Sequence, residues 1–231
     1  LGAMAGAYAD LGDESRALRY MRQALARNSQ SDAGLRLGYA SLLFKLRQDT
    51  EFEVVMDDLL RRGGLNEQQN LDLANLRIGY RLRQADLVRE DGDLARAYEY
   101  LEPLIRVNPN DPRLMMALAR LYNDSKDFDK AYVIYERVLQ QNGEEVDAYK
   151  GAIGAALAMN RVDEADAMLE RAFAVDANNP RLYALAGRAA KARGDSGRAL
   201  GLYQQALRLD AEQNAQPATA SPSGSGNSQP L

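Results

Sequence analysis

The chain has 231 residues, a formal net charge of −4 and a sequence pI near 5.1, and 46 % of its residues are hydrophobic. Its apolar content suffices for a buried core, which excludes wholesale disorder. The absence of both Cys and His excludes thiol nucleophiles, disulfides, imidazole bases and nearly all transition-metal sites. The acidic balance argues against nucleic-acid binding. No apolar run reaches the ~20 residues of a membrane helix, so we expect no membrane insertion.

Residues 1–31 predict a truncated helix pair. Leu11 to Leu18 has the pattern of a tight turn followed by a second helix, and the helix before it begins at Leu1 without a cap. A helix that begins in mid-pattern indicates that the chain is a piece of a longer one.

Residues 32–64 predict a degenerate helix pair. Apolar positions mark its first helix at Leu35, Leu37, Tyr39, Leu42 and Leu43, and its second helix at Phe52, Val55, Met56, Leu59 and Leu60. The register breaks here, because Ala17 and Ala97 are separated by two repeats plus twelve residues. Counting along this stretch assigns Glu51 to the place where the other pairs have alanine.

Residues 65–111 predict a long or extra helix together with one regular repeat. A helical stripe of small and apolar residues runs through Leu71, Ala74, Ile78, Leu82, Ala85 and Val88. It predicts a helix of about 24 residues, twice the usual length. We expect this helix to interrupt regular stacking near residues 63–78, either by redirecting the superhelix or as a local overhang.

Four gapless segments of 34 residues follow one another at 78–111, 112–145, 146–179 and 180–213. Matched positions in their first helices are Ala85, Ala119, Ile153 and Gly187, and in their second helices Ala97, Ala131, Ala165 and Ala199. Turn residues such as Gly92 and Asn160 divide the halves, and Pro112 and Pro180 open new units. Small residues are needed where two helices cross closely, and one hairpin cannot bury its own stripe, so neighbouring hairpins must stack. The sequence therefore predicts an all-α, right-handed superhelix of helix pairs.

The tail, residues 214–231, is uncharged and rich in Pro, Ser, Gly and Ala. This composition predicts a flexible linker.

Catalysis in this chain would depend on carboxylates, Lys, Tyr or Ser. Three adjacent acidic pairs are candidates by sequence, Asp57-Asp58, Glu144-Glu145 and Asp163-Glu164. Acidic residues at helix starts and on solvated helix faces are common, so a structural role is the better interpretation. No glycine-rich phosphate loop follows a strand. We therefore predict a non-catalytic chain with no cofactor and no metal.

The repeat resembles the tetratricopeptide repeat, with the best match at Pro112 to Gln141. The tryptophan that often opens that repeat is replaced by Arg81, Met115, Tyr149 and Tyr183. The resemblance implies that the first helices line a binding groove. Candidate groove residues at outward positions of these helices are Arg89, Arg113, Arg120, Tyr149, Lys150, Arg181, Tyr183, Arg188 and Lys191. They form either an ordinary solvated face or a docking strip for an acidic or extended partner.

Co-chaperone members of this family hold a C-terminal carboxylate with Lys and Asn at fixed groove positions. The clamp asparagine position is occupied here by Asp86, Arg120, Gly154 and Arg188. The departure from that pattern disfavours chaperone-tail binding.

A narrower resemblance covers residues 77–213. The runs Arg81–Leu104, Asn108–Pro112, Ala117–Tyr122 and Leu182–Ala190 are similar to the C-terminal repeats of the BcsC family, the repeat-containing proteins of bacterial cellulose synthase. That resemblance implies a periplasmic scaffold, tethered to the outer membrane in the full-length protein, that guides a nascent exopolysaccharide to a β-barrel. Implied partners are other proteins of the cellulose synthase complex, together with peptidoglycan or the nascent glucan. The alternative is a cytosolic adaptor that binds an extended peptide.

Overall fold

The computed structural model describes residues 1–27 and 32–215. Within these ranges the chain forms twelve α-helices and no strand, so the predicted all-α fold is confirmed. The helices divide into two compact units, residues 1–91 and the part of the chain from residue 92 onward. The predicted linker falls mostly on residues 216–231, which lie outside the described ranges, whereas Asn214 and Ala215 belong to the last helix.

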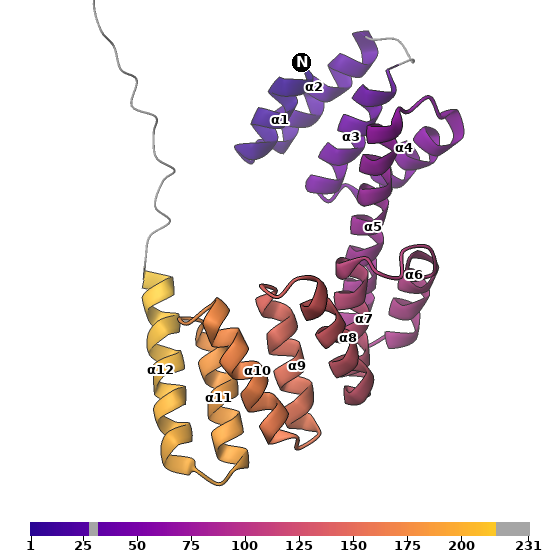
Figure 1. Ribbon diagram of the computed structural model, residues 1–231. Helices are drawn as coiled ribbons and strands as arrows, with labels where there is room; N and C mark the ends of the chain where they lie inside the picture. The colour runs from indigo at the N-terminus through magenta and orange to yellow at the C-terminus, as the bar shows by residue number, and fades with distance from the viewer. Residues whose placement is uncertain (28–31, 216–231) are drawn as a thin grey trace, which may run out of the picture. The chain divides into compact units, whose positions relative to one another are not determined.

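The first unit contains five helices, drawn in indigo to purple in Figure 1. They are α1 (Gly2–Asp10), α2 (Glu14–Arg27), α3 (Ala33–Lys45), α4 (Asp49–Arg62) and α5 (Glu67–Glu90). Helices α1 and α2 pack as one hairpin and α3 and α4 as a second, while α3 also contacts α1, α2 and α5. The core of this unit gathers Leu43, Phe52 and Leu59, each no more than 1 % exposed.

The second unit contains seven helices, drawn in magenta to yellow in Figure 1. They are α6 (Leu94–Val107), α7 (Pro112–Asp124), α8 (Phe128–Gln141), α9 (Val146–Ala158), α10 (Val162–Val175), α11 (Pro180–Ala192) and α12 (Ser196–Ala215). Consecutive helices from α6 to α12 pack on one another, and α9 contacts both α7 and α11. This regular stacking is that of a helical repeat solenoid.

Helix starts follow simple capping chemistry. Asp111 and Asn179 cap α7 and α11 with their side-chain oxygens, which accept hydrogen bonds from backbone N–H groups of the first turn. Pro112 and Pro180 follow at the first helical position, where a missing N–H costs nothing. The prolines that mark unit boundaries in the sequence therefore mark helix starts in the structure.

Each turn inside a helix pair places one residue in the left-handed region, two positions after the first helix ends. Glycine occupies this place at Gly12, Gly92 and Gly194, with φ between 77° and 86°. The other three turns use Arg47, Lys126 and Asn160, with φ between 55° and 64°. One backbone geometry thus serves all six turns, with or without glycine.

The predicted small residues occupy the places where paired helices cross. Ala97, Ala131, Ala165 and Ala199 are each the fourth residue of a second helix, and none is more than 3 % exposed. Ala17 has the same place in α2. Small side chains there bring the two helix axes close together.

The assignment of Glu51 to the alanine place is wrong, and Phe52 occupies that place. Helix α4 begins at Asp49, so its fourth residue is Phe52, which is 1 % exposed. Counting along the chain failed because one additional residue precedes α4 relative to Ala17. Glu51 instead lies at the surface, where its carboxylate accepts hydrogen bonds from Tyr39 and, at 2.7 Å, from Arg22.

The predicted long helix is confirmed as α5, a continuous helix of 24 residues. Asn66 and Gln69 form a reciprocal capping box at its start, which fixes where the helix begins. The predicted stripe is only partly correct, because Ile78 and Ala85 are buried while Leu71 is 54 % exposed. Leu73 and Tyr80 join the buried face instead. A change of direction of the superhelix at residues 63–78 stays a prediction.

Candidate binding groove

A groove of about 470 Å³ lies on the first helices of the second unit. Its lining comes from four helices: Met116 and Arg120 of α7, Tyr135 of α8, Asp147, Lys150 and Gly154 of α9, and Arg181, Ala184, Leu185 and Arg188 of α11. Four of these side chains are cationic and one is a carboxylate, so the groove carries positive charge within a chain whose net charge is −4. We call this surface the cationic groove.

The regular repeat places the charges at intervals along the groove. Arg120, Gly154 and Arg188 occupy one repeat position on α7, α9 and α11, and Lys150 lies one helical turn before Gly154. Lys150 forms an ion pair with Asp147, and its side chain is 19 % exposed. Arg181 and Arg188 are exposed on α11. The cations of the groove therefore come from three successive first helices, with Lys150 on α9 one turn away from the position that holds arginine on α7 and α11.

The floor of the cationic groove depends on a glycine. The ring of Tyr135, 3 % exposed, lies against the backbone of α9 at Gly151. A Cβ atom at Gly151 would stand 2.2 Å from Cζ of Tyr135, well inside contact distance. Gly154 has no atom within 4 Å of such a Cβ, so the groove is open at that position. One glycine lets an aromatic ring close the floor, and the other leaves room above it.

Four of the nine predicted groove residues line this groove together, Arg120, Lys150, Arg181 and Arg188. Arg113 lies at the start of α7 and binds the capping residue Asp111, with a 2.7 Å contact between Nη2 and Oδ2. That guanidinium lowers the pKa of Asp111 through its hydrogen bonds. Lys191 is exposed on the last turn of α11, outside the groove lining. Arg113 and Lys191 therefore do not line the groove.

The two predicted tyrosines and Arg89 have other places. Tyr149 is 3 % exposed and belongs to the core of the second unit, with the guanidinium of Arg171 5.3 Å from its ring centroid. Tyr183 is half-buried and packs edge-on against Phe173, with ring centroids 4.9 Å apart. Arg89 lies in α5 of the first unit, where it contacts Asp86 at 3.2 Å. Tyr149, which stands where the repeat often has tryptophan, is therefore a core residue.

Sequence reasoning missed Tyr135, Asp147, Met116 and Leu185 as groove residues. Tyr135 is on a second helix, and the prediction drew only on first helices. It reaches the groove because Gly151 permits close approach. An aromatic residue facing a glycine of the following helix was a usable signal, although it requires the pairing of the helices to be known.

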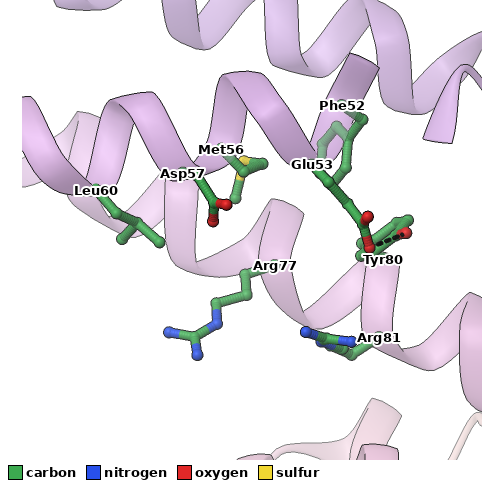
Figure 2. A pocket seen from close by; sticks show the side chains of 8 residues that line it. All are labelled: Phe52, Glu53, Met56, Asp57, Leu60, Arg77, Tyr80 and Arg81. Atoms are coloured by element: carbon green, nitrogen blue, oxygen red, sulfur yellow. Dashed lines mark hydrogen bonds between the residues drawn. The ribbon is translucent and has the colours of Figure 1, made fainter. Parts of the chain in front are cut away.

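A smaller cavity of about 310 Å³ lies in the first unit, between α4 and α5 (Figure 2). Figure 2 shows Glu53 and Asp57 on α4 and Arg77 and Arg81 on α5. The hydroxyl of Tyr80 donates a 2.7 Å hydrogen bond to Glu53, and burial raises the pKa of Tyr80. Because Tyr80 is 6 % exposed, its ring offers no open platform for stacking. The cavity is a mixed-charge surface without an aromatic binding face.

Members of the three acidic pairs lie in ion pairs or at a helix start. Asp58 contacts Arg62 at 2.6 Å, and Asp163 contacts Arg193 at 2.5 Å. Glu145 precedes α9 as its N-terminal flanking residue. Among residues 1–27 and 32–215, no group of three or more His, Cys, Asp or Glu side chains is placed to hold a metal ion. In the same ranges, no helix is both long and apolar enough to span a bilayer.

Comparison with known families and solved structures identifies the class of protein to which this chain belongs. Residues 88–134 and 123–189 match the family described as tetratricopeptide repeat. In fold, the chain is similar to BtubC from P. vanneervenii, with a TM-score of 0.63 at 20 % identity over 95 % of this chain and 97 % of that one. It is also similar to MamA MSR-1, with a TM-score of 0.54 at 18 % identity over 80 % and 99 % of the two chains. The chain is therefore a helical repeat protein that contains tetratricopeptide repeats.

Curated relatives narrow the comparison. The chain is 28 % identical over 99 % of its length to cellulose synthase operon protein C of Pseudomonas fluorescens. It is 36 % identical over 60 % of its length to the protein of that name from Xanthomonas axonopodis pv. citri. The resemblance to the repeat-containing proteins of bacterial cellulose synthase is thus confirmed. The chain spans 18 % and 9 % of the lengths of these two relatives.

Proposed function

We propose that this chain is a non-catalytic scaffold in a complex that synthesises and exports cellulose or a related exopolysaccharide. In this proposal it works in the periplasm, contacts other proteins of the synthase complex and helps to guide the polymer towards an outer-membrane barrel. Support comes from the similarity of nearly the whole chain to a cellulose synthase operon protein C. Further support comes from the stacked helices of the second unit, which carry a groove along their first helices.

The observation that carries the proposal is the cationic groove. Four cations from α7, α9 and α11 stand around a floor made of Tyr135, Met116 and Leu185. A groove of this kind suits an extended segment that bears carboxylates and a few apolar side chains, because guanidinium groups bind carboxylates in a bidentate manner. An acidic segment of another protein of the synthase complex is therefore the partner that we assign to this groove.

A pair of charge reversals tests the groove. We expect Arg120→Glu combined with Arg188→Glu to weaken capture of the other synthase proteins at least tenfold and to lower secreted cellulose. The matched control is Arg106→Glu on α6, where the side chain is 76 % exposed and outside the groove lining. Capture and secretion that match the unsubstituted protein would refute the groove as the docking surface.

Cell fractionation tests the location. We expect the intact protein to be found in the periplasmic and outer-membrane fractions. Recovery from the cytoplasm alone would contradict the export scaffold and favour the cytosolic adaptor.

Glucan contact needs a separate measurement. Soluble cello-oligosaccharides at millimolar concentration should shift amide resonances or tyrosine fluorescence if the scaffold touches the polymer itself. An unchanged spectrum would restrict the proposal to protein partners, with peptidoglycan binding then measured by sedimentation with purified sacculi.

A further inference from the structure

Polar side chains join α4 to α5 at regular places along the seam between these helices. Near the start of α4 the carboxylate of Asp49 binds the guanidinium group of Arg83. One turn later along α4, the carboxylate of Glu53 accepts a 2.7 Å hydrogen bond from the hydroxyl of Tyr80. The contacts advance along α4 as they go back along α5, so the two helices are antiparallel at this seam. Their antiparallel order fixes which residues face each other one turn further on.

Asp57 and Arg77 are the next pair in this series. Both line the cavity of about 310 Å³ between α4 and α5, and both side chains are exposed. In residues 1–27 and 32–215, no ion pair or side-chain hydrogen bond involves the Asp57 carboxylate or the Arg77 guanidinium. In Figure 2 a dashed line joins Tyr80 to Glu53, and none joins Asp57 to Arg77. The series of polar contacts is therefore interrupted at the cavity.

The cavity has two sides of opposite charge. Helix α4 contributes the carboxylates of Glu53 and Asp57, one turn apart, and α5 contributes the guanidinium groups of Arg77 and Arg81, also one turn apart (Figure 2). Helix α3 packs on both α4 and α5 and so holds the two sides in place. The buried side chains of the lining are Phe52, Met56 and Tyr80. Opposite charges on facing helices, above a partly apolar base, favour a ligand that carries both a cation and an anion.

We propose that this cavity binds a small zwitterionic peptide, with its ammonium group on Asp57 and its carboxylate on Arg77. Guanidinium groups bind carboxylates in a bidentate manner, and the Asp57 carboxylate accepts hydrogen bonds from an ammonium group. A single amino acid carries both charges on one carbon atom, whereas in a dipeptide a further residue, of about 3.5 Å, separates them. A dipeptide is therefore better suited to charges on two facing helices. A volume of about 310 Å³ is at the small end of ligand sites in proteins. The inference does not depend on the proposed function.

Titration with the dipeptide alanyl-leucine, followed by amide resonances, tests the site. We expect saturable binding in the millimolar range, with the shifted resonances on α4 and α5. N-acetyl-alanyl-leucine and alanyl-leucine amide each lack one of the two charges, so each should bind about tenfold more weakly. Free leucine should also bind more weakly than the dipeptide. Absence of saturable binding, or equal binding of the dipeptide, its capped forms and leucine, would overturn the proposal.

Substitutions on the two sides of the cavity test the assigned residues. Asp57→Asn and Arg77→Gln should each weaken the binding of alanyl-leucine about tenfold, because each removes one charge-assisted contact. The matched controls are Asp72→Asn on α5 and Arg19→Gln on α2, where the side chains are exposed and outside the cavity lining. The controls should bind as the parent does. Since all four side chains are exposed, circular dichroism should show unchanged helicity. Parent-like affinity of the Asp57 and Arg77 variants would refute the site.

A double-mutant cycle without ligand distinguishes an open site from a simple ion pair. Because Asp57 and Arg77 do not contact each other, the effects of Asp57→Asn and Arg77→Gln on the free energy of unfolding should add in the double variant. Alanyl-leucine should then raise the melting temperature of the parent more than that of either single variant. Coupling between the two substitutions in the absence of the dipeptide would show that the residues pair directly and close the cavity, which would overturn the proposal.

Discussion

The two units of the chain build the same helix pair but fill its crossing point differently. In the second unit the fourth residue of every second helix is alanine, and all four alanines are buried. In the first unit α2 keeps Ala17 at this place, while α4 has Phe52. Phe52 packs against Tyr80 and Phe44, with ring centroids 4.8 and 5.8 Å away. A phenylalanine fits where aromatic neighbours surround it, and an alanine fits where helix backbones meet.

The stacking seams differ in the same way. Between α8 and α9 the seam is filled by Tyr132 and Leu139. The corresponding residues of α4 are Glu53 and Leu60, and they border the cavity between α4 and α5. Leu60 is 52 % exposed there. At these two places the α4–α5 seam has a carboxylate and an exposed leucine, whereas the α8–α9 seam has two buried side chains.

The largest expected loss of stability comes from a substitution in the second unit. Ala165→Arg should destabilise the chain by more than about 4 kcal/mol, because a long charged side chain would separate α9 and α10 at a site with 0 % exposure. Thermal unfolding followed by circular dichroism measures the loss. A melting temperature within a degree of the parent would show that the crossing point tolerates large residues.

Phe52→Ala tests whether the crossing point of α3 and α4 in the first unit requires a large residue. Removing this buried ring should cost about 3–5 kcal/mol through lost burial and a remaining cavity, even though alanine is the residue found at that place in every other pair. Denaturant titration measures the change in the free energy of unfolding. A neutral result would mean that α4 can close onto α3 as the alanine pairs do.

Two glycines on α9 allow the effect of a close contact on stability to be measured apart from the effect of helix propensity. Gly151→Ala should destabilise the chain by about 1–3 kcal/mol, because the new Cβ meets the ring of Tyr135. Gly154→Ala, on the same helix in open space, should stabilise it by up to about 1 kcal/mol. Equal responses of the two variants would contradict the role given to Tyr135 in the groove floor.

The smallest expected effect concerns pH and the first unit. The hydrogen bond from Tyr39 and the nearby Arg22 hold the pKa of Glu51 below its ordinary value near 4.5. A lowered carboxylate pKa stabilises the fold above the unfolded-state value, and this contribution disappears as pH falls through the folded-state value. Since the Glu51 side chain is 40 % exposed, the contribution is on the order of 0.5 kcal/mol.

The substitution Glu51→Gln removes this charge-dependent contribution to the free energy of unfolding. The variant should be less stable than the parent at pH 6, and the difference should shrink as the pH falls through the folded-state pKa of Glu51 in paired melting experiments. A difference that does not change as the pH is lowered would assign the effect to geometry instead of charge.

The regular repeats of the second unit could be predicted from the sequence because their signals are local. Ala131 and Ala165 recur at a fixed interval, and Pro112 and Pro180 mark helix starts with caps beside them. Four groove cations followed from the same register. The 24 residues of α5 were also predictable, since its stripe runs without a break signal.

The remaining features depend on contacts between helices. Phe52 could not be placed by counting, because a one-residue shift before α4 changes the register without changing the apolar pattern. Tyr149 was predicted to face the groove, whereas its burial is decided by neighbouring helices that a single repeat does not specify. Tyr135 lines the groove because Gly151, in the following repeat, lets its ring approach the backbone of α9. Such pairings appear only when the stack is assembled.

The six turns inside the helix pairs have a consequence for how such a chain can change in length. All share one left-handed residue at the same distance from the preceding helix, whether it is Gly92, Asn160 or Lys126. A gene recombined at two of these points would join segments whose backbones already agree in direction. A second helix and the first helix that follows it can therefore be duplicated or deleted together without redesigning a junction, and the number of repeats becomes a quantity that recombination can adjust.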